Sequence, residues 1–188
     1  MGIGTFDPLA TLHIIGTSDN SHLVIQGAYP TQSITKPFLK LQNYAGIDLL
    51  WINTDHARNT FMGLNAGAAN NAAYGARGNT FIGSNAGRCN TTGKNNTALG
   101  EFALASSFIG APGMVCFDNQ IGDDNTAVGT SELVSNSSGN TNTSVGSSAL
   151  LNNNWGSQNT GIGFGSLNSN QTGSNNTSIG HSSLVANT

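Results

Sequence analysis

The chain has 188 residues and a net charge of −3, and only 8% of its residues are charged, against about 25% in ordinary soluble domains. The few basic residues form no patch that could neutralise phosphates, so nucleic-acid binding is not expected. No apolar run approaches the roughly 18 residues that a membrane helix needs, so membrane insertion is not expected either.

Residues 1–58 predict a small N-terminal β-region or collar. The runs TLHIIG, HLVIQGA, PFLKLQN and IDLLWIN alternate apolar and polar residues and are separated by turn-forming segments. They are typical of four short strands. A region of this size buries little surface alone, so we expect partner chains to support it. Trp51 is expected to be a core or interface residue.

Residues 59–188 contain an internal repeat. The block N-T-x-aliphatic-G begins at Asn59, Asn79, Asn96, Asn125, Asn142, Asn159 and Asn176. The steps are 20, 17, 29, 17, 17 and 17 residues. The fifth position is always glycine, the twelfth is usually asparagine, and the fifteenth is often glycine. A disordered tract has no reason to keep such a register, so the repeat predicts an ordered architecture.

The repeat predicts an all-β fold, a parallel β-solenoid of about seven 17-residue coils. Glycine, asparagine, serine and threonine recur in every repeat and disfavour helix. The segment T-x-aliphatic-G is expected to form one short strand, the segment around the ninth position a second, and N-x-x-G a turn. Stacked coils place identical residues in ladders about 4.8 Å apart, and asparagine ladders hydrogen-bond along the stack.

Two apolar positions of the repeat receive different predicted roles. The fourth position is expected to fill the coil interior, with Met62, Ile82, Leu99, Val128, Val145, Ile162 and Ile179. The ninth position is expected at a trimer interface, with Leu104, Leu133, Leu150, Leu167 and Leu184. Burying these few side chains gives about 3–5 kcal/mol per coil, whereas ordering seventeen residues opposes folding by well over about 17 kcal/mol. We therefore expect other copies to supply burial, in a homotrimer as the simplest closed form.

The repeats resemble those of trimeric fibre proteins. NTFIGSNAG, NTALGEFAL, NTAVGTSEL and NTSIGHSSL are similar to the heads of trimeric autotransporter adhesins. They resemble more closely phage-type tail fibres and bacterial surface fibres, in which a GIGT…P…LHI segment precedes the repeats, as MGIGTFDPLATLHI does here. Many of these proteins end in an endosialidase-type intramolecular chaperone, which this sequence lacks. The resemblance covers residues 1–16 and 59–188, and it implies an extracellular homotrimeric fibre.

An insertion around residues 105–124 lengthens one repeat and carries Cys116, while Cys89 lies in a repeat loop. Either the two form a disulfide that pins the insertion to the shaft, as expected outside the cell, or they are two separate buried thiols. The insertion also contributes Phe108 and Phe117, which with Trp155 are candidate contacts for a ligand. The alternative for these aromatics is packing between subunits.

The sequence predicts no catalytic residue, no metal site and no cofactor. The aspartates Asp118, Asp123 and Asp124 lack the alternating spacing of a calcium loop and are expected in a solvated turn. The histidines show no metal-ligand spacing. No nucleophile elbow comes with triad partners, and Glu132 is the only carboxylate side chain after Asp124, so a carboxylate pair for glycan hydrolysis is not expected.

The predicted function is therefore a structural, extracellular fibre subunit whose partner is itself. Because the seventh repeat ends within its register, we also expect its last coil to dock on more polypeptide, either a continuation of the chain or the next subunit of a head-to-tail polymer. The alternative function is an adhesin head that recognises a host glycan or surface protein through the insertion. A third hypothesis is ice binding through the threonine ladder at the second position.

Overall fold

A computed structural model describes residues 2–3, 13–14, 39–43, 45–105 and 122–187 of the chain. The chain divides into two compact units, Met1–Pro30 and Thr31–Thr188. In the first unit, β1 (Gly2–Ile3) and β2 (His13–Ile14) pair in parallel. The predicted strand HLVIQGA lies outside the described residues.

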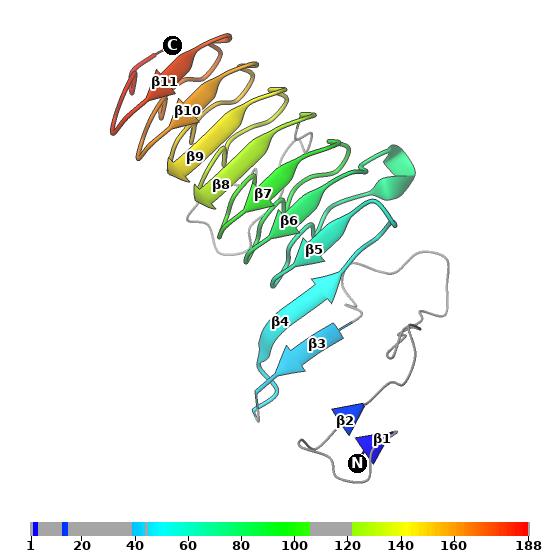
Figure 1. The fold of residues 1–188 in the computed structure, drawn as a ribbon. Coiled ribbons are helices and arrows are strands. Elements are labelled where there is room, and N and C mark those ends of the chain that lie inside the picture. The colour runs from blue at the N-terminus through cyan, green and yellow to red at the C-terminus, as the bar shows by residue number, and fades with distance from the viewer. Residues whose placement is uncertain (1, 4–12, 15–38, 44, 106–121, 188) are drawn as a thin grey trace. The chain divides into compact units, whose positions relative to one another are not determined.

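The second unit is built on one nine-stranded sheet (Figure 1). Its strands, in spatial order, are β3 (Leu39–Gln42), β4 (Asp48–Asn53), β5 (Thr60–Met62), β6 (Thr80–Ile82), β7 (Thr97–Leu99), β8 (Thr126–Thr130), β9 (Thr143–Ser147), β10 (Thr160–Ile162) and β11 (Thr177–Ile179). From β5 to β11 all pairs are parallel and join identical repeat positions. The predicted parallel β-solenoid is confirmed, with about six turns and, as its one helical element within the described residues, the single 3-10 turn Ala72–Tyr74.

The β3–β4 hairpin closes one edge of the solenoid sheet. It pairs antiparallel within itself and then with β5. The ammonium group of Lys40 lies 2.9 Å from Asp48 Oδ1, and this contact lowers the pKa of Asp48. The hairpin, which the sequence assigned to the N-terminal β-region of residues 1–58, is therefore continuous with the repeats and belongs to the same compact unit.

Each coil contains one strand rather than the two that the sequence predicted. From the fifth position onward, positions five, seven and nine all have positive φ, for example Gly129 at 134°, Ser131 at 59° and Leu133 at 49°. Left-handed residues interrupt β-alternation and turn the chain sharply. A side chain at the fifth position has no room, because a Cβ on Gly129 would overlap the carbonyl of Gly146 in the next coil.

The positions predicted for the fourth- and ninth-position side chains are wrong: the ninth position lies inside the coil and the fourth lies on its outer face. Leu104, Leu133, Leu150 and Leu167 are completely buried within a single chain, so they fill the coil interior and are no trimer interface; Leu184, in the last coil, is half exposed. The fourth-position side chains point outward from the sheet instead. Adjacent residues of a strand face opposite sides, so an error of one position exchanges inside and outside. The left-handed backbone at position nine then directs the leucine inward.

The third position also faces the interior, with Phe61, Phe81, Ala98, Ala127, Ser144, Gly161 and Ser178. The Phe61 and Phe81 rings stack with centroids 5.3 Å apart. In these two coils the ninth position is glycine, and a Cβ on Gly67 would lie 2.8 Å from the Phe61 ring. Where the third residue is small, the ninth is leucine. Each coil thus holds one phenylalanine or one leucine, supplied by either the third or the ninth position.

Asparagine side chains connect neighbouring coils through hydrogen bonds at the start of each repeat. The predicted ladders are confirmed: Asn159 Oδ1 accepts the backbone N–H of Asn176 at 3.0 Å, and the same bond joins every neighbouring pair of first-position asparagines. The carbonyl of Gly173 accepts from the side chains of both Asn159 (2.7 Å) and Asn170 (2.9 Å). These bonds satisfy buried backbone groups where the ladder of strands is absent.

Candidate functional site

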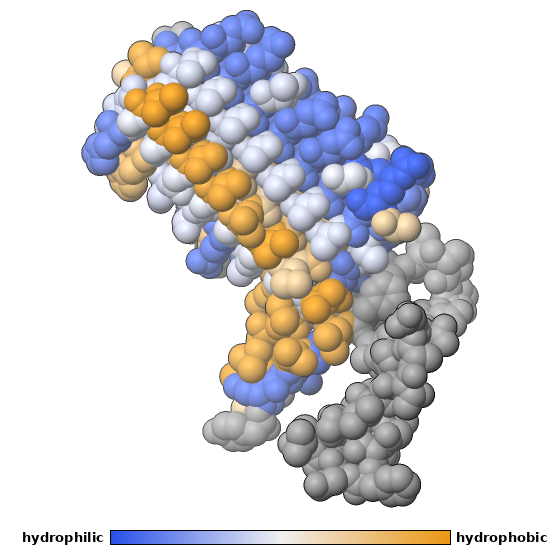
Figure 2. Space-filling model, viewed as in Figure 1, coloured by the Kyte–Doolittle hydropathy of each residue, from blue (hydrophilic) through white to orange (hydrophobic). Residues whose placement is uncertain are grey.

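The main candidate site is a row of aliphatic side chains on the outer face of the sheet, which we call the apolar row. It consists of the fourth-position residues Met62, Ile82, Leu99, Val128, Val145, Ile162 and Ile179. Strand pairing sets them side by side, one per coil. Leu99, Ile162 and Ile179 are 45%, 37% and 68% exposed, and the other four are half-buried. Figure 2 shows the row as an unbroken apolar band across the stacked coils.

The hairpin extends the apolar row although its sequence has no repeat. Ile52 of β4 pairs with Met62, and Leu39 of β3 pairs with Ile52. Leu41 and Leu50 pair with each other on the same face, because they lie two residues from Leu39 and Ile52. Apolar residues also gather on the hairpin in Figure 2. Two segments of unrelated sequence thus build one apolar surface, which argues that the surface serves a common purpose.

The apolar row is bordered by an uncharged ladder. The second position, which faces the same side as the fourth, is threonine in every repeat: Thr60, Thr80, Thr97, Thr126, Thr143, Thr160 and Thr177. Neither row contains a charged residue in any of the seven repeats. No like-charge repulsion would therefore oppose the approach of an identical face.

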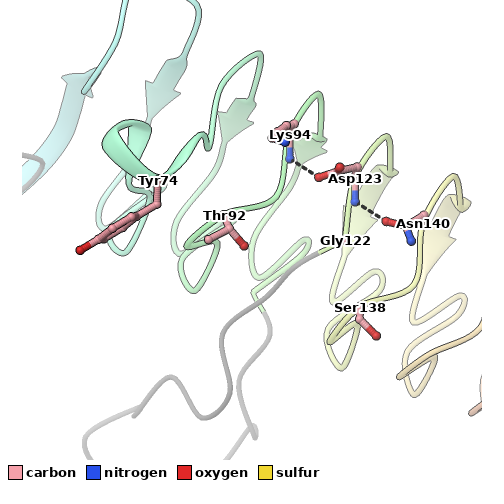
Figure 3. Close-up of a pocket in the computed structure, with 7 residues that line it drawn as sticks. All are labelled: Tyr74, Thr92, Lys94, Gly122, Asp123, Ser138 and Asn140. Carbon is pink, nitrogen blue, oxygen red and sulfur yellow. Dashed lines mark hydrogen bonds between the residues drawn. The ribbon is translucent and has the colours of Figure 1, made fainter.

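A shallow groove of about 330 Å³ lies on the turn side of the coils (Figure 3). It is lined by Tyr74, Thr92, Lys94, Gly122, Asp123, Ser138 and Asn140. Two of its polar groups are already used in the stack, because Asp123 accepts the Lys94 backbone N–H at 2.8 Å and Asn140 accepts that of Asp123 at 2.6 Å. Tyr74 lies at the rim of the groove and is 76% exposed. The groove offers hydroxyl, ammonium and aromatic groups but no buried pocket.

The candidate ligand contacts are not brought together by the described part of the chain. Trp155 is 58% exposed on a turn, whereas Phe108 and Phe117 lie outside the described residues. Phe164 stacks on His181 of the next coil, with centroids 5.1 Å apart. Both residues occupy the sixth position of adjacent repeats, two positions after the apolar row. Their spacing of 17 residues is the only sequence signal for this contact.

Cys89 is completely buried and disulfide-bonded. Its predicted partner, Cys116, lies outside the described residues, as does Asp118. Asp123 and Asp124 accept hydrogen bonds from the backbone of Lys94 and the side chain of Asn95. Within the described ranges no three His, Cys, Asp or Glu side chains gather as metal ligands, and no helix there is long and apolar enough to span a membrane.

Glu132 is the one buried carboxyl group among the described residues. It occupies the eighth position, where the other coils have alanine or serine. Its Oε2 contacts the Ser144 hydroxyl, while Oε1 has no partner. The hydroxyl also donates to the carbonyl of Ala149 at 2.8 Å. A serine has a single proton to donate, so this arrangement fits a neutral Glu132 that donates to Ser144. Burial raises the pKa of Glu132 to about 7, although the contacts of its carboxyl group with Ser144 and the Ala149 backbone act to lower it.

A comparison of the chain with protein-family models, with curated proteins and with solved structures finds no match. The function must therefore be argued from the surfaces described above.

Proposed function

We propose that this chain is a structural subunit of an extracellular homotrimeric fibre, without catalytic activity of its own. The observation that carries the proposal is the apolar row, which runs along the whole nine-stranded sheet. A contiguous apolar patch of a few hundred Å² is about the size of the largest apolar patch on a typical monomer, and such patches are often functional contact sites. A row that follows the long axis of a solenoid is suited to lateral association, which makes a fibre.

Two further features support a mechanical and extracellular role. Strand pairing and asparagine ladders connect each coil to the next without a break from β5 to β11, so load along the axis would be shared by many bonds. The disulfide of Cys89 is typical of proteins in oxidising compartments. The low charge of the chain is consistent with an inert surface.

Light scattering of the purified chain coupled to size-exclusion chromatography tests the proposal. We expect three times the monomer mass at micromolar concentration, and narrow rods in electron micrographs. A folded, stable monomer would refute the proposed assembly. The same micrographs test head-to-tail growth, which predicts rods longer than one trimer.

A second candidate function is an adhesin head that binds a host glycan or surface protein. The observation that favours it is the groove near Tyr74, because exposed aromatic rings beside hydroxyl and charged groups suit stacking and hydrogen bonding to sugars. A glycan array tests it with wild-type chain, Tyr74→Ala and Trp155→Ala, and with Thr172→Ala on an exposed turn as the control. Binding that Tyr74→Ala abolishes and Thr172→Ala preserves would support this function.

A further inference from the structure

We propose that three copies of this chain pack side by side around an axis parallel to the stack, with the apolar rows converging on that axis in register. The inference rests on the proposed fibre function and deepens it, because it assigns the contact surface and the relative register of the subunits. It also replaces the interior leucines, which the sequence suggested for this contact, by the outer aliphatic residues.

The spacing of the apolar row favours another copy of the same chain as its partner. Adjacent strands present one aliphatic side chain each, about 4.8 Å apart. A partner can interdigitate along the whole row only if its own projections repeat with the same spacing. An identical solenoid has that spacing by construction, and its Thr and aliphatic rows bring no charge to the contact.

The narrowness of the row favours three copies over two. Nine strands span about 38 Å, so a row one side chain wide covers roughly 300–400 Å². A stable pairwise interface needs about 800 Å² from each partner. Around a three-fold axis each row contacts two neighbours, and the surfaces on both of its sides, including the threonine ladder, become buried as well. A closed trimer therefore buries more surface per subunit than a face-to-face dimer does.

Cyclic symmetry then fixes the register. Rotation about an axis parallel to the stack carries every residue to a copy at the same height. Ile162 therefore meets Ile162 of the two neighbours, and the hairpin residues Leu39 and Ile52 meet their own copies at one end. An antiparallel pair of full nine-strand rows would instead place Ile162 opposite Ile52, because Leu99 is the middle residue of the nine.

Single-cysteine cross-linking tests the register. Ile162→Cys and the control Thr172→Cys, on an exposed turn of the same coil region, are oxidised and run on non-reducing gels beside wild type, which shows the background from Cys89 and Cys116. Two cysteines held together at an axis have an effective concentration in the millimolar range. Ile162→Cys should therefore form covalent dimers on the order of a hundredfold faster than Thr172→Cys at micromolar chain.

The outcomes separate this inference from the proposed function. A trimer in which Ile162→Cys cross-links no faster than Thr172→Cys would overturn the assigned surface but leave the fibre in place. Cross-linking only in mixtures of Ile162→Cys with Ile52→Cys would overturn the parallel register. A wild-type monomer would overturn both.

A charge variant gives an independent readout of the same contact. Val145→Glu places a carboxylate in the middle of the apolar row, and should convert trimer to monomer while the circular dichroism of the coils is kept. Thr172→Glu should leave the trimer intact. Retention of the trimer by Val145→Glu would overturn the inference.

Discussion

The first two coils and the later ones fill the same interior with different residues. In the first two, a phenylalanine at position three meets a glycine at position nine, as in Phe81 and Gly87. In the later coils, a small residue at position three is combined with a leucine at position nine, as in Ser144 and Leu150. The backbone is the same in both groups, since Gly87 and Leu150 both have left-handed φ values, 56° and 49°.

The difference shows what the repeat constrains and what it leaves open. Interior volume is kept, as close packing requires, whereas the position that supplies it is exchanged. The outer aliphatic position, the fifth-position glycine and the asparagine ladder do not change between the two groups. A side chain that only fills space can therefore be supplied from either position, while the residues that bond in the ladder or lie on the outer face stay in place.

The largest loss of stability should come from converting a phenylalanine–glycine coil to the small residue–leucine pattern one residue at a time. Phe81→Ala removes a buried ring and should lower the free energy of unfolding by about 3–5 kcal/mol. Gly87→Leu in the presence of the ring forces overlap with it and should also lower stability, by about 1–3 kcal/mol or more. The double variant recreates the pattern of the later coils and should recover most of the loss. Urea unfolding at fixed protein concentration measures all three.

The double-mutant cycle decides whether the two positions share one space. Independent sites would give additive losses, and additivity here would contradict the volume exchange. Thr172→Ala on an exposed turn serves as the control, with a change within about 0.5 kcal/mol.

Glu132 breaks the pattern of the later coils and should make stability depend on pH. Its pKa is about 7 in the folded chain, against 4.5 as its ordinary value. The folded state therefore keeps a proton that the unfolded state releases, so stability is greatest below pH 4.5, falls as the pH rises toward 7, and is level above that. At about 1.4 kcal/mol per pKa unit the total loss is about 3 kcal/mol. Thermal melts from pH 4 to 8.5 measure it.

Glu132→Gln and Glu132→Ala are the matched variants for this prediction. Glutamine keeps the size of the side chain but does not titrate, and alanine is the residue of most other coils at this position. Both should lose the fall between pH 4.5 and 7. A fall of the same size in Glu132→Gln would assign it to other groups.

The sequence predicted the solenoid, its coil length and the asparagine ladders, because these follow from the repeat alone. It did not predict which apolar position faces inward, because one residue of register separates inside from outside. The sequence already shows that repeats with phenylalanine at position three have glycine at position nine, whereas repeats with a small residue at position three have leucine at position nine. Read as conserved volume, it would have assigned positions three and nine to the interior.

The candidate site was less predictable than the fold. The apolar row includes Leu39 and Ile52, whose place beside Met62 depends on an antiparallel pairing that no repeat encodes. The groove joins Tyr74 to Asp123 and Asn140, which are far apart in the chain. Coil stacking across an insertion brings them together, and neither spacing nor composition signals that contact.

The smallest effect should come from the ladder that both groups of coils share. Asn79 Oδ1 accepts the backbone N–H of Asn96 at 2.9 Å, and Asn142 Oδ1 accepts that of Asn159 at 3.0 Å. Replacing either acceptor by alanine leaves a buried N–H without its partner and should lower the free energy of unfolding by about 1–3 kcal/mol. Because the ladder is the same in both groups, Asn79→Ala and Asn142→Ala should agree within about 0.5 kcal/mol, with Asn154→Ala as a control of smaller effect. Urea unfolding compares the three, and clearly unequal losses for the first two would show that the interior exchange also alters the ladder beside it.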